Sequence, residues 1–570
     1  MLNERIAQIF YDIADILEIK NENIFKIRAY RKAAATLENT SQDIIALINK
    51  NKLNTLPGIG KDLAEKIKEI TFTNNLKYFE TLKKTISPGV LELLKIPGIG
   101  AKTAFLLYDK FNVDSAEKLR LTIDKLRLID IPGVKEKTWN NIAVGIEIFN
   151  RGNERITLAS ADELSSYFIE NLKQLKTVEI AVCAGSLRRQ KETVRDIDIL
   201  AISNDPKMVM DKFTELDEVK IIQSKGQTKS SVLTHENIQV DLRVLDKKSF
   251  GAALVYFTGS QDFNVKLRQL AIKNNLKLNE YGVFDNKSHL IASKTEKDVF
   301  KALGLAYIPP EMRENYGEIE LAHINKLPKL LELLDIEGDL HIHSNYSDGK
   351  DSIEELAKRA KKMGYSYIAI TDHSESLKVA GGLNINELIR KKREIDKLNA
   401  KLKNFRILFG AEVEINSQGK IDYNPSILKE FDIVIAAIHS GFKQSKEQLT
   451  DRIIAACNNK FVNIIAHPTG KLWKVRDAYE LNFPKILKTA KETNTALEID
   501  CFPDRMDLNG SHAKLAKDYG VKIAIDSDSH AIEHLKFMKY GVSTARRGWL
   551  EKKDCLNTLK LEQLLNTIKK

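Results

Sequence analysis

The chain has 570 residues, of which 43% are hydrophobic and 29% are charged, and its formal net charge is +11. At roughly 100–200 residues per domain, this length predicts several domains, and the composition excludes a disordered chain, a collagen or a long coiled coil. No apolar run approaches the roughly 18 residues of a membrane span, and the four cysteines form no C-x-x-C pair. We therefore expect a reducing, cytoplasmic setting. The positive charge favours polyanions but is spread along the chain, so the motifs must identify the partner.

Residues 1–150 are predicted to be mostly helical, and one short phrase recurs within them. A hydrophobic-Pro-Gly-hydrophobic-Gly sequence precedes a helical run at 56–60 and 96–100, and a third copy at 131–134 lacks the second glycine. Glycines let a chain approach phosphate closely, and a helix N-terminus offers unpaired N–H groups to it. A simple turn between helices would use the same residues. Three copies favour a function, because the phrase resembles the helix-hairpin-helix motif, which binds the DNA backbone. The glycines concerned are Gly58, Gly60, Gly98, Gly100 and Gly133.

Beyond residue 150 the pattern changes twice. Short β-like runs at 178–183, 197–202 and 238–245 lie among helical stretches and indicate an α+β region. Pro309-Pro310 and a following stretch rich in Glu and Lys indicate a linker. After it, seven β-like runs mostly separated by helical segments predict an α/β barrel with its functional groups at the strand ends. The seven runs are 339–343, 368–371, 407–409, 433–438, 462–466, 496–499 and 521–525.

Three aspartates in the α+β region are candidate metal ligands. Residues two apart in a strand share a face, so Asp196 and Asp198 are expected to point the same way, and Asp241 supplies a third carboxylate from another strand. Such oxygens suit two Mg²⁺ ions, which stabilise both reacting oxygens of an in-line phosphoryl displacement. An isolated Asp-x-Asp is more often a polar strand face. A nearby phrase that would hold phosphate favours the catalytic interpretation, and its residues are Gly185, Ser186 and Arg189.

With these residues the chain resembles the nucleotidyltransferases, and the phrase Tyr-Phe-Thr-Gly-Ser at 256–260 narrows the resemblance to DNA polymerase family X. In that family the Tyr-Phe pair lines the sugar pocket and disfavours a ribose 2′-OH. Gln261 departs from an Asp common at this place, so contacts to the incoming base are expected to differ. The resemblance implies that nucleotide and template are bound by Arg155, Gly185, Ser186, Arg189, Tyr256, Phe257, Gly259, Asn264 and Arg268.

The same resemblance singles out one lysine on the helix after the first hairpin. The lyase activity of the family uses a lysine there as a Schiff-base nucleophile, and Lys66 in Ala-Glu-Lys-Ile matches it. An exposed helical lysine is usually only a solvated charge, and a lysine nucleophile needs a lowered pKa. Both interpretations of Lys66 stay open.

Residues 337–570 hold eight of the eleven histidines, and six of them stand in short phrases at predicted strand ends. One such histidine is more often a structural hydrogen-bonding group, but six favour a metal cluster. Nine candidate ligands are too many for one tetrahedral ion, and imidazole with carboxylate favours Zn²⁺, Mn²⁺ or Fe²⁺ over Mg²⁺. Two or three such ions activate water and polarise a phosphate oxygen, which gives phosphoester hydrolysis. The nine are His341, His343, Asp348, His373, Glu412, His439, His467, Asp528 and His530.

This pattern is similar to the PHP domain, a seven-stranded α/β barrel, and all nine ligand positions of that family are filled. Together the two halves resemble the bacterial-type family X polymerase with a C-terminal PHP domain. The resemblance implies templated addition of deoxynucleotides at short gaps in DNA repair, with 3′→5′ exonuclease activity and, as further options, cleavage at abasic sites or of 3′-phosphates. The implied partners are gapped or nicked double-stranded DNA and deoxynucleoside triphosphates, bound by a cytoplasmic monomer without membrane contact.

The predicted fold is multidomain. Two other functional classes stay open: an untemplated nucleotidyltransferase, which the hairpins and the Tyr-Phe pair disfavour, and a DNA-binding phosphatase with a structural polymerase half, which the complete carboxylate set disfavours. A phosphatase of small molecules would not need the hairpins.

The expected boundaries are 1–80 for a helical DNA-end-binding domain with the first hairpin, 81–150 for a fingers-like domain with the other two, 151–247 for an α+β palm, 248–310 for a thumb-like domain, 311–336 for the linker and 337–570 for the PHP barrel.

Overall fold

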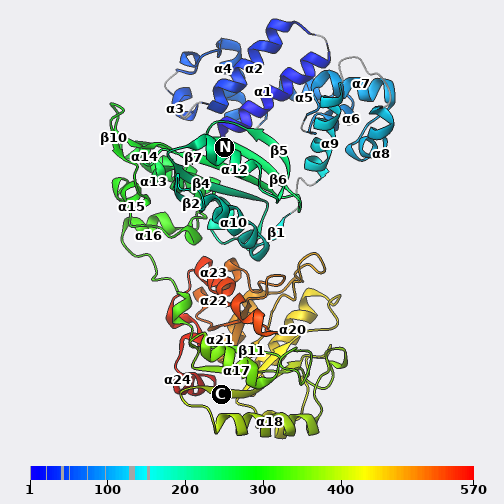
Figure 1. The fold of residues 1–570 in the computed structure, drawn as a ribbon, viewed down its shortest axis with the longest axis vertical. Coiled ribbons are helices and arrows are strands. Elements are labelled where there is room, and N and C mark those ends of the chain that lie inside the picture. The colour runs from blue at the N-terminus through cyan, green and yellow to red at the C-terminus, as the bar shows by residue number, and fades with distance from the viewer. Residues whose placement is uncertain are drawn as a thin grey trace. The chain divides into compact units, whose positions relative to one another are not determined.

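The computed structural model describes residues 2–20, 22–39, 44–49, 52–73, 75–96, 98–127, 135–150 and 155–569. The chain divides into two compact units, residues 1–154 and 155–570, which are described separately (Figure 1). The third hairpin copy at 131–134, with Gly133, lies outside the described residues. Within the described ranges, no helix combines the length and the apolar character needed to cross a bilayer.

The first unit is helical, as predicted, and contains two apolar cores. One core joins Phe10 and Leu17 to Ile67 and other residues of the first five helices, and the second surrounds Trp139. The helices are α1 (Leu2–Ile19), α2 (Ile24–Asn39), α3 (Ile44–Asn49), α4 (Lys61–Thr73), α5 (Lys77–Lys83), α6 (Pro88–Leu93), α7 (Ala101–Phe111), α8 (Ala116–Arg127) and α9 (Glu136–Asn150).

The two described hairpin turns have the same backbone geometry. Gly58 and Gly98 adopt φ of +81° and +87°, a region that favours glycine because it lacks a Cβ. Helices α4 and α7 each begin directly after the second glycine of the phrase, Gly60 or Gly100. A Cβ added to Gly60 or Gly100 would meet no atom within 4 Å, so the backbone before each helix is open. The contact of these turns with a phosphate backbone stays a prediction.

The second unit begins with an α+β palm built on a five-stranded sheet. Its strand order is β2 (Val178–Cys183), β4 (Asp196–Ser203), β7 (Gln239–Leu245), β6 (Lys229–Thr234) and β5 (Val219–Lys225). Strands β4 and β7 run parallel, and the other neighbouring pairs are antiparallel. Ile197 and Ile199 are fully buried and pack with Phe168 of α10 (Leu158–Lys173) and Phe213 of α12 (Pro206–Thr214). Strand alternation therefore turns the intervening acidic residues to the other face.

The thumb continues further along the chain than its apolar pattern indicated. Its helices and strands are α13 (Phe250–Thr258), α14 (Gln261–Lys273), β8 (Lys277–Asn279), β9 (Gly282–Phe284), β10 (Leu290–Ala292) and α15 (Glu296–Ala302). The segment 311–336, for which we predicted a linker, forms α16 (Glu318–His323), and its residues Met312, Ile319, Ala322 and Leu330 join the thumb core. These apolar residues are widely spaced among Glu and Lys, so the composition of the segment conceals its packing.

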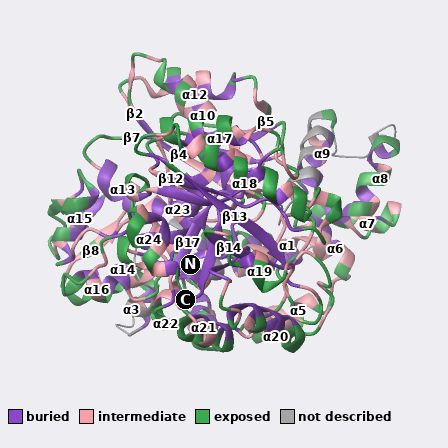
Figure 2. Cartoon of the chain, turned by 90° about the horizontal axis from the view of Figure 1, so that it is seen from below, coloured by how far each residue is buried: buried purple, intermediate pink, exposed green. Residues whose placement is uncertain are grey.

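The C-terminal part is the predicted parallel α/β barrel, and all seven predicted strands are confirmed. They pair in sequence order, and a bridge between Ile342 and Ser529 links the first strand to the end of the last. Nearly every strand residue is buried, as the purple centre of Figure 2 shows. The strands are β11 (Gly338–Ile342), β12 (Tyr367–Ile370), β13 (Arg406–Glu414), β14 (Ile433–Ala437), β15 (Ile464–Ile465), β16 (Ala496–Asp500) and β17 (Ile523–Asp526).

Helices surround the barrel strands, and some of the barrel's residues complete the neighbouring cores. Met506 and Tyr540 are buried in the palm core, and Trp549 is buried in the thumb core. Leu564 of the last helix packs against the strands. The helices are α17 (Ile353–Lys362), α18 (Ile385–Asn399), α19 (Pro425–Leu428), α20 (Lys446–Cys457), α21 (Phe483–Glu492), α22 (Gly510–Tyr519), α23 (Met538–Arg547) and α24 (Leu561–Ile568). The barrel, palm and thumb are thus one packed unit.

Candidate active sites

The three predicted aspartates come together on adjacent palm strands. The parallel register of β4 and β7 places Asp198 directly beside Asp241, and Asp196 shares the face of Asp198 two residues earlier. Gln239 donates a hydrogen bond of 2.9 Å to Asp241, and Arg195 lies 3.2 Å from Asp196. Burial raises the pKa of Asp198 to about 6, and repulsion by the other two carboxylates adds to this effect. The site therefore concentrates negative charge that a cation would neutralise.

The predicted phosphate phrase forms a tight turn against this carboxylate face. Gly185 adopts φ of +61°, and a Cβ on it would lie 2.5 Å from Oδ2 of Asp198. The N–H of Ala184 donates a hydrogen bond of 2.8 Å to the backbone oxygen of Asp198. Ser186 follows in the short helix α11 (Gly185–Arg188). Only glycine fits at position 185, which brings the backbone of this turn next to the predicted cation ligands.

The two arginines after this turn point to other partners. Arg188 forms a two-pronged ion pair with Glu296, at 2.8 and 2.7 Å. Arg189, which we predicted as a phosphate contact, is buried, and its Nε lies 3.0 Å from Glu314. Its Nη1 donates to the backbone oxygen of Thr258 at 2.8 Å. Both arginines therefore connect the phosphate turn to the thumb, through acidic partners more than 100 residues away that no local pattern reveals.

Arg155 lies near the carboxylates at the start of the palm. Its Nε donates a hydrogen bond of 2.6 Å to Oγ1 of Thr193. Burial and the neighbouring Arg195 lower its pKa, while Asp196 and Glu192 oppose this shift. The triphosphate contact of Arg155 stays a prediction.

The predicted sugar-pocket residues stand at the junction of α13 and α14. The rings of Tyr256 and Phe257 meet edge to face at 5.1 Å between centroids. The side chain of Asn264 donates a hydrogen bond of 2.6 Å to the backbone oxygen of Tyr256, and Arg268 donates to the backbone oxygen of Asn264 at 3.3 Å. A Cβ on Gly259 would lie 2.6 Å from the Asn264 side chain. A small cavity is lined by Tyr256, Asn264 and Arg268 among others, so these residues form one structural group.

Lys66 lies on α4 in the first unit. Its Nζ is 2.5 Å from Oδ1 of Asp62, and its side chain is only 16% exposed. It also lies 5.5 Å from the centre of the Tyr78 ring, over which Lys26 stands at the same distance. Lys66 is therefore more sheltered than the freely solvated lysine that was the alternative interpretation.

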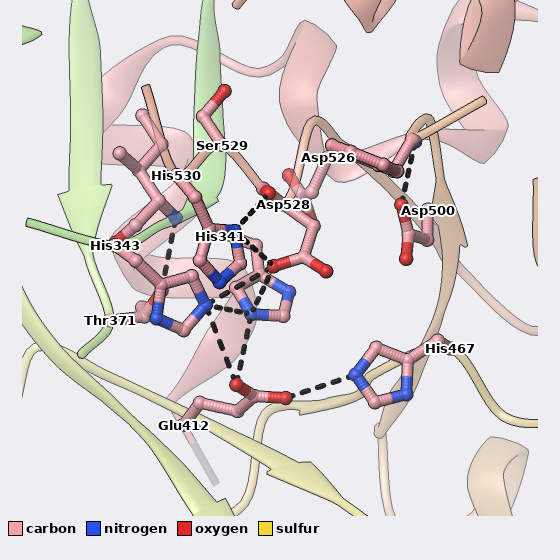
Figure 3. A network of polar contacts seen from close by, with 12 residues as sticks. His341, His343, Thr371, Glu412, His467, Asp500, Asp526, Asp528, Ser529 and His530 are labelled. Atoms are coloured by element: carbon pink, nitrogen blue, oxygen red, sulfur yellow. Dashed lines mark hydrogen bonds and ion pairs between the residues drawn. The ribbon is translucent and has the colours of Figure 1, made fainter. Parts of the chain in front are cut away.

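The predicted histidines converge at the carboxyl ends of the barrel strands. Figure 3 shows His341, His343, His467 and His530 near Glu412 and Asp528. Parallel strands bring these ends to one rim, where loops can supply ligands from several strands. Oxygen and nitrogen atoms form three groups, and within each group all ligand atoms lie within 4.8 Å of one another. His467 is outside the three groups, but its Nε2 lies 3.0 Å from Glu412. The groups are His343, Asp348, His373 and His530; His341, His343 and Asp528; and His373, Glu412 and His439.

The protonation pattern of this cluster is uneven. Burial opposes the charged form of His373, but Glu412 and Asp348 outweigh it and raise its pKa to about 10. Burial together with His530 and His373 lowers the pKa of His343 to about 4. Nδ1 of His343 and Nδ1 of His467 are buried without a hydrogen bond to any described residue. Neutral imidazoles with unpaired nitrogens beside ionised carboxylates fit a set of transition-metal ligands.

A second layer of buried acidic groups holds the ligands in place, and no sequence pattern predicted this role. Glu498 accepts a hydrogen bond of 2.6 Å from the backbone N–H of His467 and lies 2.7 Å from Nδ1 of His341. Glu414 lies 2.8 Å from Nδ1 of His439. Such partners fix the orientation of a ligand ring. Glu414 was visible in the phrase Ala-Glu-Val-Glu, but alternation alone does not assign it to the second layer.

One further buried ion pair supports the strand that carries His373. Lys391 and Asp372 are both fully buried, and their charged atoms lie 2.8 Å apart. Lys391 also donates a hydrogen bond of 3.0 Å to the backbone oxygen of Gly410, and Asp372 accepts one of 2.7 Å from the N–H of Ser344. The pair thus joins the segments that follow β11 and β12 to the middle of β13, next to the ligand rim.

Comparisons with known proteins match most of the chain. Family models match as follows: a helix-hairpin-helix domain at 1–76, a SAM-like helix-hairpin-helix tandem at 90–147, a DNA polymerase beta thumb at 253–314 and a PHP domain at 339–501. The chain is 39% identical over 567 residues to the DNA polymerase/3′-5′ exonuclease PolX of Bacillus subtilis (strain 168), covering 99% of each protein.

Two other relatives each match one half of the chain. DNA polymerase lambda of Rattus norvegicus is 27% identical over 290 residues, which are 46% of this chain and 48% of that protein. A probable phosphatase of Thermoanaerobacter sp. (strain X514) is 34% identical over 203 residues, which are 34% of this chain and 78% of that protein.

Together, the fold, the sites and these matches define a family X DNA polymerase that carries a PHP domain. The full-length similarity specifies the group within that class. The chain belongs to the PolX family of DNA polymerase/3′-5′ exonucleases. The polymerases and nucleases of these families depend on metal ions, which agrees with the two clusters of potential ligands.

The raised pKa of Asp198 predicts a pH-dependent affinity for Mg²⁺. Below about pH 6 the carboxyl group is protonated and cannot bind a cation, so affinity should fall roughly tenfold per pH unit there and level off above it. The measurement is the half-saturating Mg²⁺ concentration for primer extension between pH 5 and 7.5, in a His341→Ala/His343→Ala background to suppress degradation. A flat profile across this range would contradict the assignment.

The contacts of Glu498 predict that it orients two ligands at once. Glu498→Gln keeps the shape of the side chain but removes the carboxylate beside His341, so metal affinity of the barrel should fall about 10–100-fold. Metal retained after dialysis against graded chelator concentrations measures this change. Glu492→Gln, at an exposed acidic residue at the end of α21, is the matched control and should retain wild-type metal. Equal retention in both variants would refute the positioning role.

Proposed function

We propose that this chain fills short gaps in DNA at the palm carboxylates and removes nucleotides from 3′ ends at the barrel cluster. The observation that carries this proposal is the presence of two chemically different ligand sets in one chain. One consists of three aspartates beside the tight turn at Gly185, and the other of imidazoles and carboxylates at a barrel rim. The names of the relatives, a polymerase/exonuclease and a polymerase, support this combination.

For synthesis, we propose that Asp196, Asp198 and Asp241 hold two Mg²⁺ ions. Ions bound there would stabilise the attacking 3′ oxygen and the leaving pyrophosphate oxygen in an in-line displacement at the α-phosphorus. The turn at Gly185 and Ser186 would offer backbone N–H groups and a hydroxyl to the triphosphate, and Arg155 would add positive charge. Because Arg189 is buried against Glu314, we propose that it holds this turn in position and does not contact the triphosphate.

For nucleotide selection, we propose that α13 and α14 form the sugar and base pocket. The Tyr256 and Phe257 rings present a wall against which a ribose 2′-OH would collide. Asn264 holds the backbone of this wall through its bond to the Tyr256 oxygen, and Gly259 leaves room for that side chain. Arg268, next in this hydrogen-bonded group, would contact the template strand.

For degradation, we propose that the nine barrel ligands hold two or three Zn²⁺ or Mn²⁺ ions. Such ions would activate a water molecule and polarise a phosphate oxygen of the terminal phosphodiester. Glu498 and Glu414 hold the ligand rings in their orientations. Abasic-site cleavage and removal of 3′-phosphates would use the same phosphoester chemistry.

For DNA binding, we propose that the open backbone at the hairpin glycines contacts phosphates of gapped or nicked duplexes. Gly58, Gly60, Gly98 and Gly100 present this backbone in the described turns. Such contacts are independent of sequence, which suits an enzyme that acts at breaks wherever they occur.

The two ligand sets predict separable activities. Asp196→Ala or Asp241→Ala should reduce primer extension on a gapped substrate by at least 1,000-fold, because a lost carboxylate removes metal binding, and should leave 3′ degradation at its wild-type rate. His341→Ala/His343→Ala should do the reverse and lose bound transition metal. Both activities are measured on one labelled gapped duplex, with and without nucleotides. Extension by either aspartate variant, or digestion by the double histidine variant, would contradict the proposed function.

We further propose Lys66 as the nucleophile of a 5′-deoxyribose-phosphate lyase. Its amine would attack the C1′ aldehyde of the ring-opened sugar and release water to form a Schiff base, which borohydride reduces to a stable adduct. Lys66→Ala should abolish the trapped complex with an incised abasic duplex. Lys68→Ala is the matched control, since Lys68 lies on the same helix and is ion-paired to Glu65 at 2.8 Å. Equal trapping by both variants would exclude Lys66.

A further inference from the structure

A buried cluster of charges joins the barrel to the back of the phosphate turn. Arg547, in the last turn of α23, donates from Nη1 to the backbone oxygen of Arg189 at 2.9 Å. The same Nη1 lies 3.1 Å from Oε1 of Glu314, and Nε of Arg189 lies 3.0 Å from that oxygen. The side chains of Arg547, Arg189 and Glu314 are only 8–9% exposed. One carboxylate therefore holds two arginines, one from the palm and one from the barrel.

Two more contacts fix the residues that follow the turn. Oγ of Ser543, one helical turn before Arg547, donates to Oε1 of Gln190 at 2.9 Å. The backbone N–H of Gly510, at the start of α22, donates to Glu192 at 3.1 Å. Gln190 adopts φ of +57°, a conformation that a non-glycine residue holds only when its surroundings support it. The barrel supplies that support, because Arg547 and Gly510 bind residues on either side of Gln190 and Ser543 binds Gln190 itself.

The supported segment is continuous with the proposed triphosphate site. The N–H of Lys191 donates a hydrogen bond of 3.1 Å to the backbone oxygen of Ser186, and the N–H of Arg189 donates to that of Gly185 at 3.3 Å. Gly185 in turn lies against Asp198 with no room for a Cβ. A displacement of residues 189–192 therefore reaches Ser186 and the carboxylate site through two hydrogen bonds and one tight contact.

We infer that Arg547 is a positioning residue for nucleotide addition, so that the nuclease barrel forms part of the polymerase's nucleotide-binding apparatus. This inference rests on the proposed function of the palm. Arg547 touches no proposed ligand of either site and acts through Arg189 and the turn. Without it, the buried oxygens of Arg189 and Glu314 lose a charged donor, a loss that is costly where water cannot replace it. The turn then samples positions that bind the triphosphate poorly.

The test compares two adjacent arginines of the same helix. Arg546 makes a partly buried contact from the barrel to the thumb segment, with Nε 2.8 Å from Glu311, and none of its side-chain hydrogen bonds or ion pairs involves residues 185–192. Arg547→Ala should raise KM for the deoxynucleotide in single-gap filling about 10-fold or more and lower kcat less. Arg546→Ala should leave KM within about twofold of wild type. The affinity for gapped DNA and the 3′ degradation rate should match wild type in both variants.

Arg547→Lys keeps a positive charge but not the planar fork, and it should give an intermediate KM. If Arg547→Ala fails to fold, this lysine variant decides the question. Equal KM values for the variants at 546 and 547, or a parallel fall of polymerase and nuclease activity in Arg547→Ala, would overturn the inference. If the wild-type chain adds no nucleotide at all, the proposed function of the palm fails and the inference falls with it.

Discussion

Both sites depend on parallel strand pairing that holds ionisable side chains close together. In the palm, the parallel register of β4 and β7 forces Asp198 beside Asp241, and the cost appears as a pKa raised to about 6. In the barrel, seven parallel strands deliver their ligands to one rim, where acidic and imidazole groups crowd within a few ångströms. The hydrogen bonds between the strands hold these groups in place before a cation binds. The ligands therefore need little rearrangement to bind one.

The barrel adds a second constraint, because imidazole rings rotate unless something holds them. Glu498 and Glu414 contact the ring nitrogens that face away from the cluster, and the buried Lys391–Asp372 pair ties neighbouring strands together. The palm solves the same problem differently. Its carboxylates are short side chains on strands, and the tight turn at Gly185 limits the space beside them. Contacts with charged groups therefore position the ligands of the barrel, and steric contact with the Gly185 turn positions the carboxylates of the palm.

Much of this architecture could be predicted because its signals are local. Strand alternation identified Asp196 and Asp198, repeated phrases identified the hairpins, and histidines after apolar runs marked the barrel rim. The predictions failed or stopped where partners are distant in sequence. Arg189 was expected to face phosphate because Glu314 could not be foreseen as its partner, and Glu498 gave no signal because a lone acidic residue in a strand looks like any other. The segment 311–336 was expected to be a linker because its few apolar residues are widely spaced, yet it packs into the thumb core.

The shared cores have a consequence for how the protein is made. Tyr540 and Met506 fill the palm, and Trp549 fills the thumb, although all three lie near the end of the chain. On the ribosome, the palm and thumb are translated hundreds of residues before these side chains emerge, so their apolar interiors stay incomplete until synthesis is nearly finished. A ribosome that stalls early would release a polymerase half with exposed apolar surface, a substrate for chaperones and proteases. Translation order thus couples completion of the polymerase cores to synthesis of the nuclease barrel.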